Sequence, residues 1–158
     1  MGLKEVVDFA AESGLECLEV ACWPTSGGEK RRYAGVSHIK TENLTAEKAE
    51  EIKAYMKVKG VDISALAYYP NMLDPDEEKR RTYVEHLYRL IDASALLDVN
   101  MVTTFLGRIP NQSVSHNLEE VKKSGLRFWN MHRQKALELQ LKTVRCYLQK
   151  MNGRVDRI

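Results

Sequence analysis

Three apolar stretches recur along the first two thirds of the chain, and each lies between a helix-like segment and a loop that contains a proline. They are segments 15–23, 61–69 and 99–106. β-Branched and aromatic residues dominate them and turn residues bound them, which is typical of strands. The apolar residues form runs instead of a strict alternation, as expected for a parallel sheet that is buried on both faces.

The segments between these strands have helical spacing. Apolar residues recur at that spacing between Thr45 and Gly60, two residues suited to cap a helix at its start and its end. A second helix is expected to begin at Asp74, because the run Asp-Pro-Asp-Glu resembles a capping box with proline at the first helical position. The chain also opens inside a helical segment. Helices that alternate with strands in this order predict parallel strands joined by right-handed crossovers.

The predicted fold is therefore α/β, a partial (β/α)8 TIM barrel with about three parallel strands and flanking helices. A closed barrel needs eight strands and usually ~250 residues, whereas this chain has 158. We expect an interior piece of a larger barrel, with two open sheet edges. No run approaches the ~18 apolar residues of a membrane helix, so no membrane partner is expected.

Charge divides the chain at about Ser124. Residues 1–123 carry 16 Lys and Arg against 20 Asp and Glu, a net of −4, whereas residues 124–158 carry 8 against 2, a net of +6. We expect a partial barrel over 1–123 and a basic tail over 124–158. The tail shows no evident period-two run, so it is expected to be helical. The three cysteines form no CxxC pair, which favours a reducing cytoplasm.

In parallel α/β folds, functional side chains lie at the C-terminal ends of the strands and in the loops that follow. Three clusters meet this condition: Glu19, Trp23 and the loop 25–39; Tyr68, Tyr69 and Asn71; and Thr103, Thr104, Gly107 and Arg108. Glu19 stands out, because a carboxylate in a buried strand is costly unless it is paired or functional. Tyr68 and Tyr69 are either ordinary strand aromatics or, at a Tyr-Tyr-Pro-Asn strand end, residues that stack on a sugar and donate hydrogen bonds.

The loop 25–39 joins a Ser-Gly-Gly turn to the cations Lys30, Arg31 and Arg32. Backbone amides and cations together bind anions, so this loop is a candidate cover for a phosphorylated or polyhydroxylated ligand. A solvated loop is the alternative, since the run lacks the ending of a P-loop. His38 is either a proton carrier or a surface residue.

The remaining histidines and cysteines have simpler interpretations. His86, His116 and His132 lie on helical stretches and are expected to be solvated, whereas Cys17 and Cys22 are expected in the core. No HxH or HExxH motif is present, so the sequence predicts no complete metal site.

Residues 3–123 resemble bacterial sugar phosphate isomerase/epimerase-like proteins. The resemblance rests on the runs CWPTSGGEKRRYAGVSHIKTENLTAEKAEEI, KGVDISALAYYPNMLDPDEEKR and LLDVNMVTTFLGR. These proteins belong to the xylose isomerase-like TIM-barrel superfamily, which also includes endonuclease IV. The resemblance implies a divalent metal, often Mn²⁺ or Mg²⁺, held by Glu, Asp and His residues on later strands. It also implies proton transfer through an enediol-type step on a sugar or sugar phosphate.

The chain departs from this family after Lys123. The family continues with a helix near a Trp-Pro-Pro and a strand with an IENCPM-like metal-ligand motif. Codons for the residues from Ser124 onward can be chosen so that a second reading frame, which starts at the third base of the Ser124 codon, encodes this family-like continuation. That second frame contains no stop codon. We interpret residues 124–158 as a frameshifted translation, and we expect the chain to lack the principal metal ligands and to be inactive alone.

The predicted site combines the strand-end rule with the resemblance. Glu19 and His38 are the predicted catalytic residues, and the predicted substrate-binding residues are Trp23, Arg31, Arg32, Tyr69, Asn71 and Thr104. The side chains of Glu19, Tyr69 and Thr104 are expected to converge. Two alternatives stay open: an endonuclease IV-like DNA-repair protein, which the net −4 disfavours, and a non-enzymatic fragment whose basic tail binds anions or nucleic acid.

Overall fold

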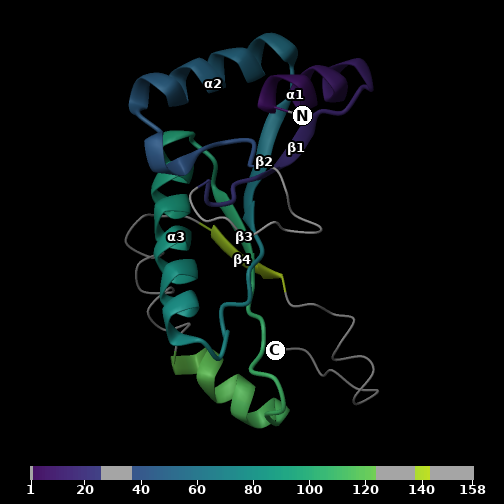
Figure 1. Ribbon diagram of the computed structural model, residues 1–158. Helices are drawn as coiled ribbons and strands as arrows, with labels where there is room; N and C mark the ends of the chain where they lie inside the picture. Colours follow the sequence, from purple (N-terminus) through teal and green to yellow (C-terminus); the bar gives the residue numbers. More distant parts are fainter. Residues whose placement is uncertain (1, 26–36, 124–137, 143–158) are drawn as a thin grey trace.

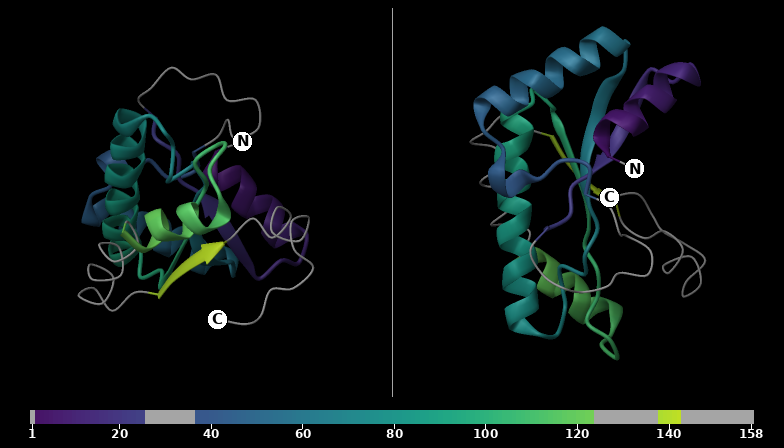
Figure 2. Two further views of the ribbon diagram at one scale, coloured as in Figure 1. Left: turned by 90° about the horizontal axis from the view of Figure 1, so that it is seen from below. Right: turned by 45° about the horizontal axis from the view of Figure 1, so that its top comes forward.

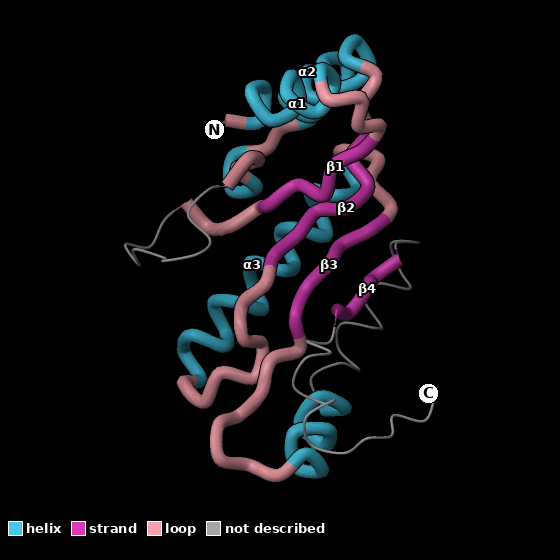
Figure 3. The backbone as a smooth tube through the Cα atoms, turned by 90° about the vertical axis from the view of Figure 1, so that its right-hand side faces the viewer, coloured by secondary structure: helices cyan, strands magenta, loops and turns pink. Residues whose placement is uncertain are grey.

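The computed structural model describes residues 2–25, 37–123 and 138–142. Its elements, in chain order, are α1 (Leu3–Glu12), β1 (Cys17–Ala21), the 3-10 helix η1 (Thr41–Asn43), α2 (Ala46–Lys59), β2 (Asp62–Tyr68), α3 (Glu77–Leu96), β3 (Met101–Phe105) and β4 (Glu138–Lys142). Residues 114–123 are also helical. The strands are parallel neighbours in the order β1-β2-β3-β4, side by side in Figure 3. The α/β class of a partial TIM barrel, with its three predicted strands, is confirmed.

The expectation of a helical tail is wrong for residues 138–142, which form β4 and pair with β3. Leu139 and Leu141 alternate there with polar residues, a short period-two pattern that the sequence interpretation overlooked. The edge of β3 would otherwise present unpaired backbone groups, and such groups readily pair with a further strand. The rest of the tail lies outside the described residues, so the boundary at Ser124 and the frameshift stay predictions.

Helices cover one face of the sheet. In Figures 1 and 2, α3 runs alongside the strands, and α1 and α2 lie near the end where β1 and β2 begin. The larger core cluster joins strand residues to α3 and includes Val20, Leu66, Tyr68, Val102, Leu87, Leu90 and Ile91. A smaller cluster contains Val7 and Ala10 of α1, Met56 of α2, and Val61. Burial of these apolar side chains holds the helices against the sheet.

The caps of α2 are those that the sequence predicts. The Thr45 hydroxyl accepts a hydrogen bond from the backbone N–H of Lys48, which satisfies one of the open donors of the first turn. Gly60 ends the helix with φ of 66°, a left-handed conformation that glycine adopts at little cost.

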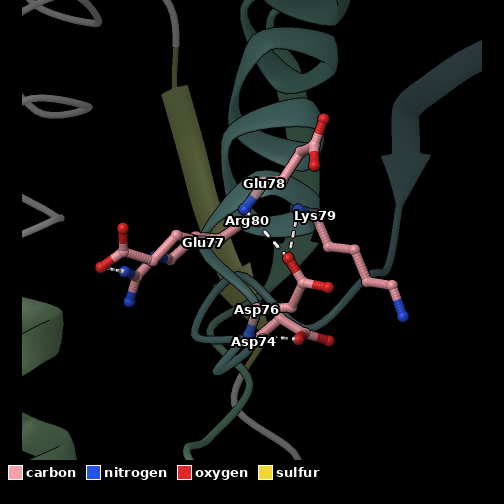
Figure 4. A network of polar contacts seen from close by, with 6 residues as sticks. All are labelled: Asp74, Asp76, Glu77, Glu78, Lys79 and Arg80. Atoms are coloured by element: carbon pink, nitrogen blue, oxygen red, sulfur yellow. Dashed lines mark hydrogen bonds and ion pairs between the residues drawn. The ribbon is translucent and has the colours of Figure 1, made fainter.

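The start of α3 differs from the prediction by two residues. Asp76, not Asp74, is the N-cap, and its carboxylate accepts the backbone N–H groups of Glu78 and Lys79 (Figure 4). Asp74 instead accepts the N–H of Asp76 and closes the turn before the helix. Both aspartates suit a cap, and the second one lies where the turn ends.

Candidate functional site

Three polar side chains from three neighbouring strands meet toward the C-terminal end of the sheet. Glu19 lies on β1, Tyr69 directly follows β2 and Thr103 lies on β3. The Tyr69 hydroxyl donates to Glu19 Oε1 at 2.5 Å and lies 2.8 Å from Thr103 Oγ1. The Thr103 hydroxyl also donates a hydrogen bond to Glu19 Oε2 at 3.3 Å. We refer to these residues as the Glu19–Tyr69–Thr103 cluster.

The cluster lies on the face of the sheet that the helices leave open. Val20 and Tyr68, the sequence neighbours of Glu19 and Tyr69, belong to the core that packs against α3. Because successive side chains of a strand point to opposite faces, Glu19 and Tyr69 point away from that core. The same alternation explains why a carboxylate is tolerated in β1, since Glu19 is exposed.

Small residues on β2, the strand between β1 and β3, make the cluster possible. Ala67 of β2 pairs with Ala21 of β1 on one side and with Thr103 of β3 on the other. Glu19 pairs with Ala65, so both positions of β2 beneath the cluster carry only a methyl group. The Glu19 side chain can therefore reach across β2 to the Thr103 hydroxyl.

The cluster has an aromatic border. The rings of Tyr69 and Phe105 lie with their centroids 4.5 Å apart and their planes 35° apart. Phe105 is two residues beyond Thr103 on β3, so it shares the open face. The site thus combines an ionisable carboxylate, a phenol, an alcohol and an aromatic surface, which suits a small ligand rich in hydroxyl groups.

Two predicted site residues lie on the helix-covered side instead. The Trp23 ring packs against Tyr68, with centroids 4.9 Å apart in an edge-on arrangement. Thr104 pairs with Tyr68 in the register and is 1% exposed. The expected convergence is therefore wrong in one member, because Thr103 and not Thr104 joins Glu19. Two consecutive threonines at a strand end cannot be assigned to faces until the register is known.

Asn71 connects the loops that follow β2 and β3. Its Nδ2 donates to the carbonyl oxygen of Arg108 at 2.9 Å, and its Oδ1 accepts from the N–H of Arg108 at 2.8 Å and of Leu73 at 3.2 Å. Gly107 has φ of +75°, and a Cβ there would lie 1.8 Å from Asn71 Oδ1. Asn71 therefore fixes the loops at the sheet end that carries the cluster, while its contact with a substrate stays a prediction.

His38 lies at the end of β1, where its backbone N–H donates to the carbonyl oxygen of Ala21 at 2.8 Å. Its side chain is half-buried, and its catalytic role stays a prediction. Arg31 and Arg32 belong to residues 26–36, which lie outside the described part of the chain.

His86 and Cys17 differ from their predicted environments. His86 is 1% exposed, and its Nε2 lies 2.9 Å from the carbonyl oxygen of Cys22. His86 lies four residues before the buried Leu90, on the same face of α3, and this spacing was the signal for burial. Cys22 is buried as predicted, but Cys17 is exposed, because it lies on the open side of β1, as Glu19 does.

The described residues do not fit a divalent metal. Across residues 2–25 and 37–123, no group of three His, Cys, Asp or Glu side chains comes together. Mg²⁺ and Mn²⁺ prefer several oxygen ligands that include carboxylates. Glu19 is joined by a phenol and an alcohol, so we assign no step to a metal at this cluster.

A parallel sheet with helices on one face places the chain in the α/β class and is consistent with part of a TIM barrel. Within that class, the chain belongs to the xylose isomerase-like TIM barrel family, which matches residues 7–143. No curated protein sequence matches the chain.

Solved structures show the same fold at low sequence identity. The IOLI protein with a bound zinc atom has a TM-score of 0.62 at 12% identity over 91% of this chain and 47% of its own. A D-tagatose 3-epimerase-like protein has a TM-score of 0.61 at 17% identity, over 89% of this chain and 51% of its own. The 3-keto-D-glucoside 4-epimerase YcjR of E. coli has a TM-score of 0.60 at 17% identity, over 88% and 50%. The chain thus spans about half the length of these structures.

Proposed function

We propose that the Glu19–Tyr69–Thr103 cluster belongs to the binding site for a sugar or sugar phosphate in a protein of the isomerase or epimerase type. The observation that carries this proposal is the meeting of a carboxylate, a phenol and an alcohol from three adjacent strands. Barrels place their substrates at this end of the strands. Structural neighbours named as epimerases support the substrate class.

The proposed reaction moves a proton at a carbon next to a sugar carbonyl. A carboxylate is a suitable base for such a step, and Glu19 is the exposed carboxylate of the cluster. The Tyr69 hydroxyl orients that carboxylate by donating to its Oε1. His38 is the proposed second proton carrier, and Arg31 and Arg32 are proposed to bind anionic groups.

We propose that the chain binds sugar but does not complete this reaction by itself. Relatives in the family imply a divalent metal, Mn²⁺ or Mg²⁺, and the described donor set does not form its site. Calorimetric titration with Mn²⁺ is therefore expected to show weak binding. Tight binding of one Mn²⁺ per chain would overturn this part of the proposal.

Sugar binding is tested by titrating the full chain with D-fructose and D-fructose 6-phosphate, followed by calorimetry and by NMR. The variant Glu19→Gln is expected to weaken the binding of the preferred sugar about tenfold, because a charged acceptor makes stronger hydrogen bonds than an amide. Glu16→Gln is the matched control, since Glu16 is exposed at the opposite end of β1. Equal losses in both variants, or no binding of either sugar, would contradict the proposed function.

The nucleic-acid alternative has less support from the described residues. An exposed carboxylate in the cluster repels a phosphodiester backbone.

No helix in the part of the chain that the structure describes combines the length and apolar character needed to cross a bilayer. The cytoplasmic location is proposed from the cysteine pattern of the sequence alone.

A further inference from the structure

The aromatic pair beside Glu19 joins Tyr69, a predicted substrate-binding residue, to Phe105, which has no role predicted from the sequence. Tyr69 and Phe105 are both half-buried, with their ring centroids 4.5 Å apart. The Tyr69 hydroxyl is held at its far end by Glu19 and Thr103. The ring of Tyr69 therefore has a fixed position between the polar cluster and the second ring.

The strand beneath this surface, β2, carries only small side chains there. Ala67 lies between Ala21 and Thr103 in the register, and Ala65 pairs with Glu19. Alanine side chains at these two positions of β2 leave room for Glu19, Tyr69 and Thr103 to meet above the strand. Ala65, Ala67 and Thr103 are themselves buried. A ligand can therefore contact the exposed Glu19 carboxylate and the half-buried rings of Tyr69 and Phe105.

The chemistry of this surface distinguishes neutral ligands from anions. The C–H face of a sugar packs on an aromatic ring, and a carboxylate accepts hydrogen bonds from two hydroxyl groups. Glu19 brings a negative charge, whereas Tyr69 and Thr103 are neutral hydroxyl groups. A phosphate at this position would face a like charge, which is unfavourable.

We propose that Tyr69 and Phe105 form a stacking platform that, with Glu19, binds the uncharged hydroxyl-bearing end of the substrate and not its phosphate. Phe105 is thereby assigned as a specificity-determining residue. This inference rests on the proposed function and specifies which part of the ligand the cluster contacts.

The test uses the full 158-residue chain with two probes, D-fructose and inorganic phosphate, and follows the NMR signals of Tyr69, Thr103 and Phe105. We expect D-fructose to shift these signals and phosphate to leave them unchanged. Phe105→Leu, which keeps an apolar side chain but removes the ring, is expected to weaken D-fructose binding about threefold to tenfold. Phe105→Trp is expected to restore it, and Phe9→Leu is the matched control because Phe9 is 60% exposed on α1.

The outcomes separate this inference from the function on which it rests. If phosphate shifts the three signals as D-fructose does, the preference for an uncharged end is wrong, while sugar binding at the cluster stands. If Phe105→Leu and Phe9→Leu bind D-fructose equally well, the platform is wrong. If neither D-fructose nor D-fructose 6-phosphate binds the unmodified chain, the proposed function fails and this inference fails with it.

Discussion

The carboxylate of Glu19 reaches the hydroxyl of Thr103 across an intervening strand, although 84 positions separate the two residues in the sequence. On β2, Ala65 pairs with Glu19 and Ala67 pairs with Thr103, so the strand between them carries only methyl groups beneath this contact. Tyr69 completes the contact from the end of β2 by hydrogen bonding to both side chains. The site therefore depends on small residues that have no chemistry of their own.

The first prediction concerns the variant Ala67→Leu. The larger side chain fills the space above β2, so it should separate Glu19 from Thr103 and weaken D-fructose binding at least about tenfold. Overpacking is expected to cost about 1–3 kcal/mol of unfolding free energy. Calorimetry measures the binding and urea denaturation the stability. Ala54→Leu, at an exposed position of α2, should leave binding unchanged, and retained binding in Ala67→Leu would contradict the role of Ala67.

Local patterns were sufficient for most of the fold. The strands follow from apolar runs bounded by turn residues, and the ends of α2 follow from Thr45 and Gly60. These signals lie within a few residues of the elements that they define. The start of α3 was harder because Asp74 and Asp76 both suit a cap, and only the path of the preceding turn decides between them.

The site was only partly predictable, since it depends on register. Glu19 and Tyr69 were found from their positions at strand ends. Thr104 was predicted in place of Thr103, because adjacent residues face opposite sides of the sheet and the sequence does not show which one faces the site. An irregularity between Leu18 and Glu19 shifts the pairing of β1 with β2. No pattern in the sequence predicts such a shift in pairing. Phe105 was missed for the same reason, because its partner ring lies on another strand.

The second prediction compares two glycines with similar backbone conformations. Gly107 has φ of +75° and lies against Asn71, whereas Gly14 has φ of +71° and no atom within 4 Å of an added Cβ. Gly14→Ala should cost about 1–2 kcal/mol from the left-handed conformation alone. Gly107→Ala should cost more, because its Cβ also displaces Asn71 from Arg108. Urea denaturation of both variants measures the difference, and equal losses would show that the Asn71 contact has no energetic importance.

The third prediction concerns the contact between α1 and α2. Asp8 of α1 accepts a hydrogen bond from the Tyr55 hydroxyl at 2.6 Å and pairs with Lys59 at 2.6 Å. The hydrogen bond from Lys59 is the main cause that lowers the pKa of Asp8 below 3.8, with a further contribution from Tyr55. The bond with Asp8 in turn raises the pKa of Lys59 above 10.5.

The sign of the pH dependence follows from these two shifts. A lowered Asp8 pKa stabilises the fold above the unfolded value of 3.8, and that stabilisation is lost as the pH falls through the folded pKa. A raised Lys59 pKa stabilises the fold below 10.5, and that stabilisation is lost as the pH rises through the folded pKa.

Asp8→Asn should therefore be less stable than the unmodified chain between pH 3.8 and pH 10.5. The difference in unfolding free energy between the two proteins should shrink toward acid and toward alkaline pH. Thermal unfolding across the pH range measures it, with Asp62→Asn, an exposed acid at the start of β2, as the control. If the difference in stability between the unmodified chain and Asp8→Asn stays constant into acid, the ion pair is not its source.

The last prediction concerns the two described cysteines, Cys17 at the start of β1 and Cys22 directly after its end. Cys22 is fully buried, its thiol donates to the carbonyl oxygen of Val20 at 3.5 Å, and burial raises its pKa to about 12. Because the thiolate is the reactive form, the buried Cys22 thiol is expected to react very slowly at pH 8. Cys17 is exposed, so iodoacetamide should label it rapidly and label Cys22 only after denaturation. Peptide mass spectrometry of a Cys146→Ser background measures both rates, and equal rates in the folded protein would place Cys22 outside the core.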